Sequence, residues 1–138
     1  MVNVGDSRMI KDQVLEEKAF YVNRALLKQY ADASGDQNPI HQDEAFAKSV
    51  GLPDVIAHGM LTMGLVAKYV SEIAGGSAKV LEFGGRFTKP VIVPAGADVD
   101  VTVTATVTDV VDGKASLSLS ATSAGVKVLG MAKAVVAL

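Results

Sequence analysis

Apolar and polar positions alternate strictly in the last third of the chain. From Val99 onward, apolar residues at every second position alternate with an aspartate and four threonines, which predicts a strand with one apolar face. Asp112-Gly113 then suits a tight hairpin turn, and residues 115–122 resume the alternation as an antiparallel strand. After a break at 123–125, the stretch 126–136 predicts a third strand. One face of this meander is apolar and must be covered by something other than these strands.

The middle of the chain provides the helix that covers this face. Residues 59–73 are apolar on nearly every side of a helical wheel and end at paired glycines, as expected for a helix enclosed by a sheet. Helical spacing behind an Asn23 cap predicts a second helix through Ala33. Asp43 is expected to cap a shorter helix through Val50.

Two more strands complete the predicted fold. They are expected over residues 13–20 and 79–87, the latter with a bulge at Gly84-Gly85. The fold class is therefore α+β, a curved antiparallel sheet wrapped around a buried central helix. Residues 1–138 are expected to form one domain, because this length leaves no room for two ordinary ones.

Composition narrows the classes of function. Hydrophobic residues make up 49% and charged residues 20% of the chain, and the net charge is −2, which argues against nucleic acid and anionic membranes as partners. The absence of cysteine excludes disulfides, thiolate metal sites and a cysteine nucleophile. Residues 1–6 carry no secretory pattern, and Lys68 and Glu72 interrupt the apolar stretch from Gly59, so we expect a cytoplasmic protein without a membrane span.

The first candidate for chemistry is the segment from Ala33 to Asp43. It gathers turn-forming residues around Asp36 and His41, and an irregular segment of this kind can direct a carboxylate and an imidazole into a cleft. Two such groups can share one water molecule, one accepting a proton while the other donates one. The pattern is consistent with an acid–base site for hydration.

Two other interpretations of this segment remain open at this stage. Asp36 and Asn38 can act as turn residues that bond local amides, with His41 capping the next segment and no chemistry at all. Alternatively, Asp36, His41 and Asp43 can hold a metal ion, although three ligands in one loop without a second histidine at ligand spacing give thin support.

The second candidate lies where a loop enters the buried helix, at His58-Gly59. The Gly59 amide is one of the unpaired donors at a helix N-terminus and can hold an oxyanion. Because glycine lacks a side chain, a thioester carbonyl can approach that amide closely. The alternative is that Gly59 only permits tight helix entry, while His58 bonds a neighbouring carbonyl.

At these residues the chain resembles the MaoC-like, (R)-specific enoyl-thioester hydratases. The residues that match their hydratase motif are Tyr30, Ser34, Gly35, Asp36, Asn38, Pro39, Ile40, His41 and Asp43. The similarity continues through residues 57–61 and, more loosely, 87–91 and 93–96. Asn38–His41 and residues 56–64 resemble the catalytic subunits of mycobacterial hydroxyacyl-carrier-protein dehydratases in particular.

The resemblance implies a hot-dog fold and a dimer, with an identical or a related hot-dog chain as partner. It implies Asp36 and His41 as the catalytic pair, Asn38 as the residue that orients them, and the Gly59 amide as the site of the thioester oxygen. Met60 joins these as a candidate substrate-binding residue. One departure is Ala67, which stands where some relatives have a serine near the acyl pocket.

The reaction that the resemblance implies is reversible hydration of trans-2-enoyl thioesters of coenzyme A or acyl carrier protein, without metal or redox cofactor. Arg86 and Lys89 are candidates to meet the phosphates of such a substrate. Two rivals remain, an acyl-thioesterase of the same fold and a noncatalytic acyl-thioester-binding subunit of a heterodimeric dehydratase. The sequence leaves open the chain length of the acyl group, the choice between coenzyme A and carrier protein, and the direction and pathway of the reaction. It also leaves open which member of the pair is the acid and which is the base.

Overall fold

The structure, a computed structural model, describes residues 9–138. The prediction that residues 1–6 carry no secretory pattern lies outside these residues. None of the described helices is long and apolar enough to cross a membrane.

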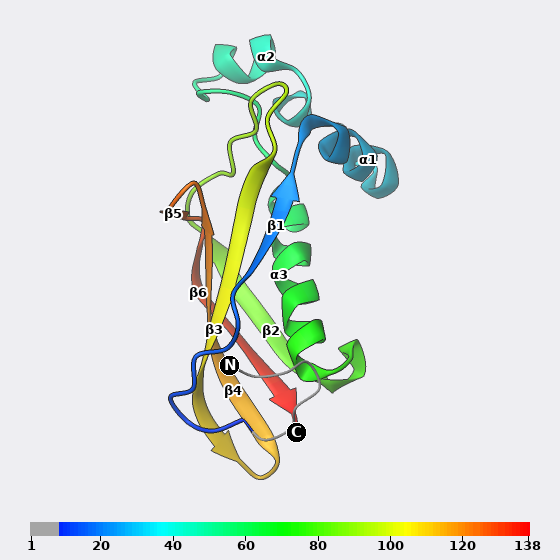
Figure 1. The fold of residues 1–138 in the computed structure, drawn as a ribbon. Coiled ribbons are helices and arrows are strands. Elements are labelled where there is room, and N and C mark those ends of the chain that lie inside the picture. The colour runs from blue at the N-terminus through cyan, green and yellow to red at the C-terminus, as the bar shows by residue number, and fades with distance from the viewer. Residues whose placement is uncertain (1–8) are drawn as a thin grey trace.

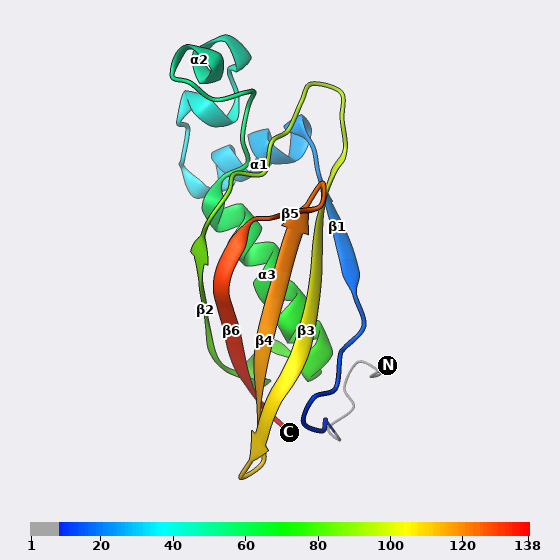
Figure 2. The ribbon, with the colours of Figure 1, turned by 90° about the vertical axis from the view of Figure 1, so that its left-hand side faces the viewer.

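A curved antiparallel sheet forms most of the molecule (Figures 1 and 2). Its order is β1-β3-β4-β6-β2, and the short strand β5 pairs with β4 off this path. The strands are β1 (Lys18–Val22), β2 (Val80–Phe87), β3 (Val99–Val111), β4 (Lys114–Ser123), β5 (Val126–Lys127) and β6 (Leu129–Ala137). Every pairing between them is antiparallel.

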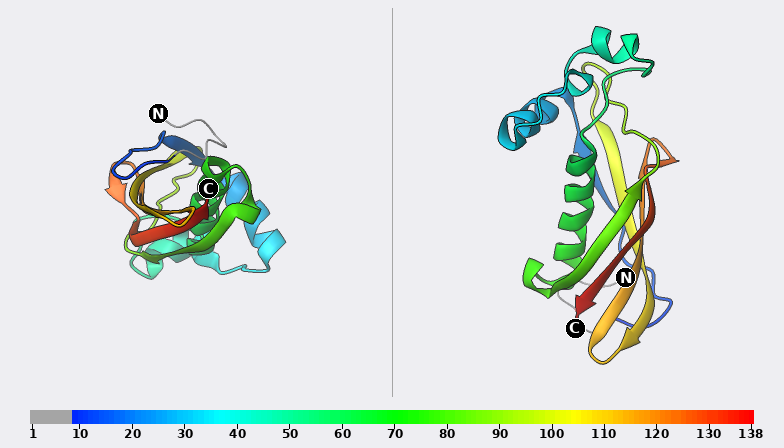
Figure 3. Two further views of the ribbon diagram at one scale, coloured as in Figure 1. Left: turned by 90° about the horizontal axis from the view of Figure 1, so that it is seen from below. Right: turned by 180° about the vertical axis from the view of Figure 1, so that it is seen from behind.

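The longest helix, α3 (Gly59–Ala74), lies along the concave side of the sheet. Seen from below, the strands curve around it (Figure 3), and α3 contacts β2, β3 and β6. The remaining helical elements are α1 (Arg24–Ser34), α2 (Glu44–Ser49) and the two 3-10 turns η1 (Pro39–His41) and η2 (Ser77–Lys79). Helices α1 and α2 gather with η1 at one end of the sheet (Figure 1). The predicted hot-dog architecture, an α+β fold, is confirmed.

The hydrophobic pattern that predicted β3 and β4 holds in the structure. Val101, Val103, Ala105 and Val107 are all buried, and they form the face of β3 that packs into the core. The hairpin turn has positive φ at both Asp112 and Gly113, as a type I′ turn requires.

Two predicted strands differ from those observed. The strand expected over residues 13–20 is shifted, because residues 13–17 make only the isolated bridge of Val14 to Thr106, and β1 continues to Val22, where the Asn23 cap starts α1. The third strand of the meander is divided between β5 and β6, which run on either side of Val128.

Glycines set the ends and bends of the central elements. Gly35 and Gly75 adopt the left-handed conformation, with φ of 82° and 85°, and each ends a helix. In β2 the register shifts between Gly84 and Arg86, so the predicted bulge is present. Phe87 follows directly and lies over the start of α3, where its ring approaches Gly59.

Candidate active site

Short side-chain bonds build the loop that carries Asp36. Behind the left-handed Gly35, the Ser34 hydroxyl accepts a bond from the Asp36 amide at 3.1 Å. The Asp36 carboxylate in turn accepts from the Asn38 amide at 3.1 Å, and the Asn38 side chain accepts from the Ile40 amide at 3.2 Å. The turn interpretation therefore describes how the loop folds, with the Asn38 main-chain amide bonded to the Asp36 carboxylate.

The side chain of His41 is buried and tethered to a second loop. Its Nδ1 lies 2.7 Å from the carbonyl oxygen of Ile56. Because a carbonyl can only accept, Nδ1 carries the proton and, in the neutral ring, Nε2 keeps its lone pair. The Ile56 amide also donates to the Ile40 carbonyl at 3.2 Å, so the loops before α2 and before α3 are bonded side by side.

His58, the residue before α3, completes a compact cluster. One donor atom each from Asp36, His41 and His58 lie within 4.8 Å of one another. The Nε2 of His58 donates to the Asp36 main-chain carbonyl at 3.1 Å, so His58 does bond a carbonyl from an adjacent loop. Burial lowers the pKa of His58 below its usual value, with the bond to Asp36 opposing this, and the ring is therefore neutral near pH 7.

The cluster fits a metal ion poorly. Asp43, one of the three ligands considered above, instead caps α2 by accepting from the Phe46 amide at 3.0 Å. The rings of His41 and His58 are stacked, with centroids 3.9 Å apart and planes inclined by 24°, so their in-plane lone pairs run side by side instead of converging on one point.

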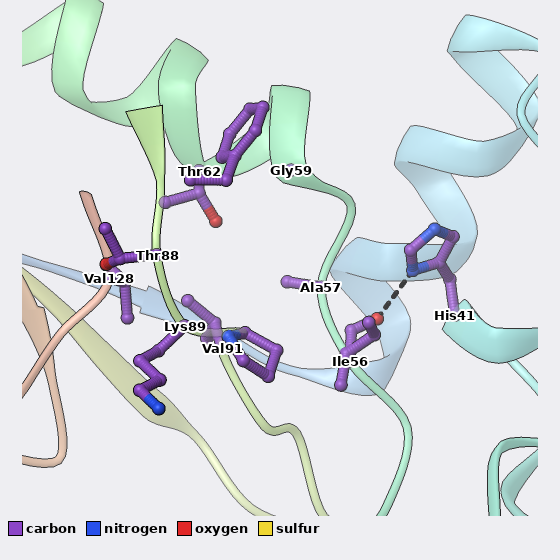
Figure 4. Close-up of a pocket in the computed structure, with 11 residues that line it drawn as sticks. His41, Ile56, Ala57, Gly59, Thr62, Thr88, Lys89, Val91 and Val128 are labelled. Carbon is purple, nitrogen blue, oxygen red and sulfur yellow. Dashed lines mark hydrogen bonds between the residues drawn. The ribbon is translucent and has the colours of Figure 1, made fainter. Parts of the chain in front are cut away.

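Beside the cluster lies a cavity of about 300 Å³, drawn in Figure 4. His41 and Gly59 both line it, together with Thr62 from the next turn of α3 and the segment that follows β2. Val128, between β5 and β6, contributes to the wall. Most of the lining is apolar, so the cavity suits an apolar group presented to an imidazole and a helix N-terminus.

The cavity includes some predicted site residues and leaves out others. Asp36 is exposed at the surface beside His41 and does not line it. Met60 is 62% exposed and lies outside it, whereas the buried Thr62 faces it. Thr62 was missed by sequence reasoning, although a threonine in an otherwise apolar helical turn is a polar signal of this kind. Lys89 also lines the cavity.

The first two amides of α3 have no hydrogen-bond acceptor in the described chain, and the first belongs to Gly59 on the cavity wall. The amides of Leu61 and Thr62 donate to the His58 carbonyl, and within residues 9–138 no acceptor bonds the Gly59 or Met60 amide. A Cβ at Gly59 would lie 3.1 Å from two carbons of the Phe87 ring. Glycine thus lets the Phe87 ring pack against the start of α3, at a helix N-terminus that favours negative charge.

Comparison with known proteins identifies the family. Residues 6–125 match the MaoC like domain. The chain is 40% identical over 76 residues to 3-hydroxyacyl-thioester dehydratase X of Mycobacterium tuberculosis, covering 55% of this chain and 26% of that protein. It is 41% identical over 56 residues to peroxisomal enoyl-CoA hydratase 2 of Arabidopsis thaliana, covering 39% of this chain and 18% of that protein. The match therefore spans about a quarter or less of these curated relatives.

Solved structures agree with this assignment. A MaoC-like dehydratase superposes with a TM-score of 0.93 at 34% identity, covering 99% of this chain and 43% of that chain. The (R)-hydratase from A. caviae involved in PHA biosynthesis superposes with a TM-score of 0.81 at 26% identity, covering 95% of this chain and 98% of that chain. A family match over most of the chain and a shared fold together show that this chain belongs to the MaoC-like domain family.

Proposed function

We propose that the protein catalyses the reversible addition of water to trans-2-enoyl thioesters of coenzyme A or acyl carrier protein, giving (R)-3-hydroxyacyl thioesters. The observation that carries this proposal is that His41 and the unpaired Gly59 amide line one cavity, with the Asp36 carboxylate beside His41. An imidazole base and an oxyanion donor on one apolar cavity, with a carboxylate beside the base, are suited to the hydration of a conjugated thioester.

His41 is the base in this proposal. With Nδ1 donating to Ile56, Nε2 is the nitrogen that accepts a proton from water as oxygen bonds to C3 of the substrate. The proton that His41 has taken from water then passes through the Asp36 carboxylate to C2 on the same side, which returns both groups to their starting states. The water is consumed across the double bond, so atoms balance without a metal or redox cofactor.

The Gly59 amide stabilises the charge that this addition creates. As water attacks C3, negative charge moves to the thioester oxygen, and an amide aimed at that oxygen bonds it more strongly in the transition state than in the ground state. The N-terminal dipole of α3, a helix of 16 residues, acts in the same direction. The position of Lys89 on the cavity wall supports a contact with the phosphates of the carrier, and we propose Arg86 of β2 as a second such residue.

The test is turnover of crotonyl-CoA by the purified protein and by two variants. We expect loss of the enoyl absorbance without release of free thiol, and an (R)-3-hydroxy product. The substitutions Asp36→Asn and His41→Ala are each expected to lower kcat/KM by about 10²-fold or more, because each removes an acid–base group. Circular dichroism and urea titration establish that both variants are folded.

Asp32→Asn serves as the matched control, since Asp32 is an exposed carboxylate in the last turn of α1, shortly before Asp36, and accepts bonds from Lys28 and Gln37. Its activity is expected to equal that of the unaltered protein. Free thiol release would support the thioesterase instead, and the absence of turnover with full substrate binding would support the noncatalytic subunit. Near-normal turnover of either test variant would overturn the assigned pair.

We also propose that β2 pairs with a second hot-dog chain, identical or related. This strand ends the sheet order, so one side of its backbone has no neighbouring strand in the described chain. Leu81 and Phe87 on β2 are 48% and 55% exposed, and an open edge strand with exposed apolar residues favours pairing. A structure of the ChsH1-ChsH2 complex from Mycobacterium tuberculosis, with a TM-score of 0.80 at 25% identity, supports a related chain as the partner.

A further inference from the structure

His58 is almost fully buried at the point where three parts of the fold meet. Its exposed fraction is 1%, and it is the N-cap residue of α3, yet its side chain makes no capping bond. Instead the ring lies against Tyr30 of α1, with centroids 4.8 Å apart, and against His41 of η1. The side chain is therefore used for contacts outside its own helix.

The single hydrogen bond of this ring fixes the main chain of Asp36. Nε2 donates to the Asp36 carbonyl at 3.1 Å, which assigns the ring proton to Nε2 because a carbonyl only accepts. Nδ1 is then an unprotonated acceptor, and within the described residues this buried atom has no partner. A buried polar atom without a partner is costly, so the arrangement needs a reason beyond core packing.

The face of the same ring supports His41. The two imidazoles stack at 3.9 Å, while the Nδ1–H of His41 bonds Ile56 in the plane of its own ring. An in-plane bond and a stacked neighbour together define both the direction and the tilt of the His41 ring. His58 thus contacts both members of the pair, Asp36 through its carbonyl and His41 through its ring face.

A neutral ring suits this place better than a charged one. Protonation of Nδ1 would create a second donor in a buried position without an acceptor, directly against His41. A lysine or arginine here would add a positive charge beside the base that has to accept a proton. Phenylalanine would keep the stacking surface and lose the bond to Asp36, and glutamine would keep a donor and lose the stacked ring.

We infer that His58 is a positioning residue for hydration, which holds the Asp36 main chain with Nε2–H and orients the His41 ring by stacking. This inference rests on the proposed function of Asp36 and His41. His58 itself does not touch the substrate, since it does not line the cavity that His41 and Gly59 share. Its loss is therefore expected to slow the chemical step while leaving substrate binding in place.

The experiment compares His58→Gln and His58→Phe with the unaltered protein, using crotonyl-CoA at temperatures where urea titration shows each variant folded. His58→Phe is expected to lower kcat by about tenfold to 10²-fold with KM changed less than about twofold, as for small misplacements of catalytic groups. His58→Gln is expected to recover part of this loss, because its amide N–H reaches the region of Nε2. A structural role alone would change stability without splitting kcat from KM.

Nitrogen-15 NMR of the imidazole rings tests the same inference without substrate. In the unaltered protein we expect His58 to carry its proton on Nε2 and His41 on Nδ1. In His58→Gln, which lacks the stacked ring, the His41 ring is expected to lose its single tautomer. If the unaltered protein hydrates no enoyl thioester, the proposed function fails. The comparison of the His41 tautomer between the unaltered protein and the variant still decides whether His58 orients that ring.

Any of three results would overturn the inference. One is a folded His58→Phe variant with kcat within twofold of the unaltered protein. The second is an unchanged His41 tautomer in a folded His58→Gln variant, and the third is a His58 ring protonated on Nδ1 in the unaltered protein. A His58→Gln variant no faster than His58→Phe would overturn the part assigned to the Asp36 bond. Should His58→Phe fail to fold, the glutamine variant and the tautomer of the unaltered protein carry the test.

Discussion

At the scale of single residues, main-chain groups determine how the reactive side chains lie. His41 takes its direction from the Ile56 carbonyl, the Asp36 carboxylate from the Asn38 amide, and His58 from the Asp36 carbonyl. The bond to Ile56 keeps the proton of the neutral His41 ring on Nδ1. It leaves Nε2 of this cavity-lining residue as the unprotonated nitrogen. The loop sequence therefore acts mainly through turns that present carbonyls and amides at defined points.

Gly59→Ala is the residue-scale prediction for the oxyanion donor. The added methyl group lies 3.1 Å from the Phe87 ring, but that side chain is 55% exposed and can move aside. We expect a folded protein, since alanine favours a helix over glycine by about 1 kcal/mol. We expect kcat/KM for crotonyl-CoA to fall by about 10²-fold, because the methyl group keeps the carbonyl away from the amide.

The double variant Gly59→Ala with Phe87→Ala separates two causes of this loss. If the methyl group blocks the carbonyl, activity stays low when the ring is removed. If activity returns to that of Phe87→Ala alone, displacement of the ring caused the loss, and the Gly59 amide is not the donor. Steady-state kinetics on the four proteins of this cycle measures the difference.

The sequence was sufficient to nominate Asp36, His41 and Gly59, because each belongs to a motif whose local spacing carries the signal. It did not indicate which side of α3 faces the cavity. The helix is apolar on nearly every side, so periodicity left its rotation undefined, and Met60 was chosen where the structure turns Thr62 inward. The catalytic roles of the nominated residues remain predictions.

At the scale of elements, the open edge of β2 leads us to predict that the protein assembles through this strand. Leu81→Lys places a charge on an edge strand where the register with β6 shifts, and a lysine on an edge strand opposes pairing with another chain. We expect the unaltered protein to sediment with twice its chain mass of 14.3 kDa or with a related chain, and Leu81→Lys to sediment as a single chain.

Val111→Lys is the matched control for this assembly test. Val111 is 54% exposed, similar to Leu81, but it lies at the tip of the β3–β4 hairpin and away from β2. Its assembly state is expected to be unchanged. An unaltered protein that sediments as a monomer at all concentrations, alone and with related chains, would contradict pairing through β2.

Element boundaries were predicted well where turn chemistry is local and less well where long-range pairing decides. The Asn23 and Asp43 caps and the bulge near Gly85 follow from residues within a few positions of each boundary. By contrast, residues 13–17 have strand-like patterning, but only Val14 pairs with β3. Nor does composition reveal that the third strand of the meander divides at Val128, because pairing with β4 and β2 sets that break.

At the scale of the whole molecule, one buried hydroxyl ties α3 to the segment before β1. Tyr69 is 1% exposed, and its hydroxyl donates to the Glu16 carbonyl at 2.7 Å. Burial raises the pKa of Tyr69 to about 12, above its usual value of 10.0. The folded state thus favours the neutral phenol, and this contribution is present below pH 10 and is lost as the pH rises toward about 12.

The prediction is that stability falls through this alkaline range and that Tyr69→Phe removes most of the fall. At pH 7 the variant is expected to lose about 1 kcal/mol of unfolding free energy, as for a net hydrogen bond. Urea titrations at several pH values measure both effects. Tyr21→Phe, at a tyrosine that is 64% exposed, is the control. If this variant reduced the alkaline fall in unfolding free energy as much as Tyr69→Phe does, the role of Tyr69 would be contradicted.

The bonds between the two loops around the site are reciprocal. His41 in the first loop bonds the carbonyl of Ile56 in the second, and His58 in the second bonds the carbonyl of Asp36 in the first. Neither loop can move outward without breaking both hydrogen bonds, so we expect thermal opening to displace Asp36, His41 and Gly59 together. Local unfolding is then expected to remove the whole candidate site in one cooperative step.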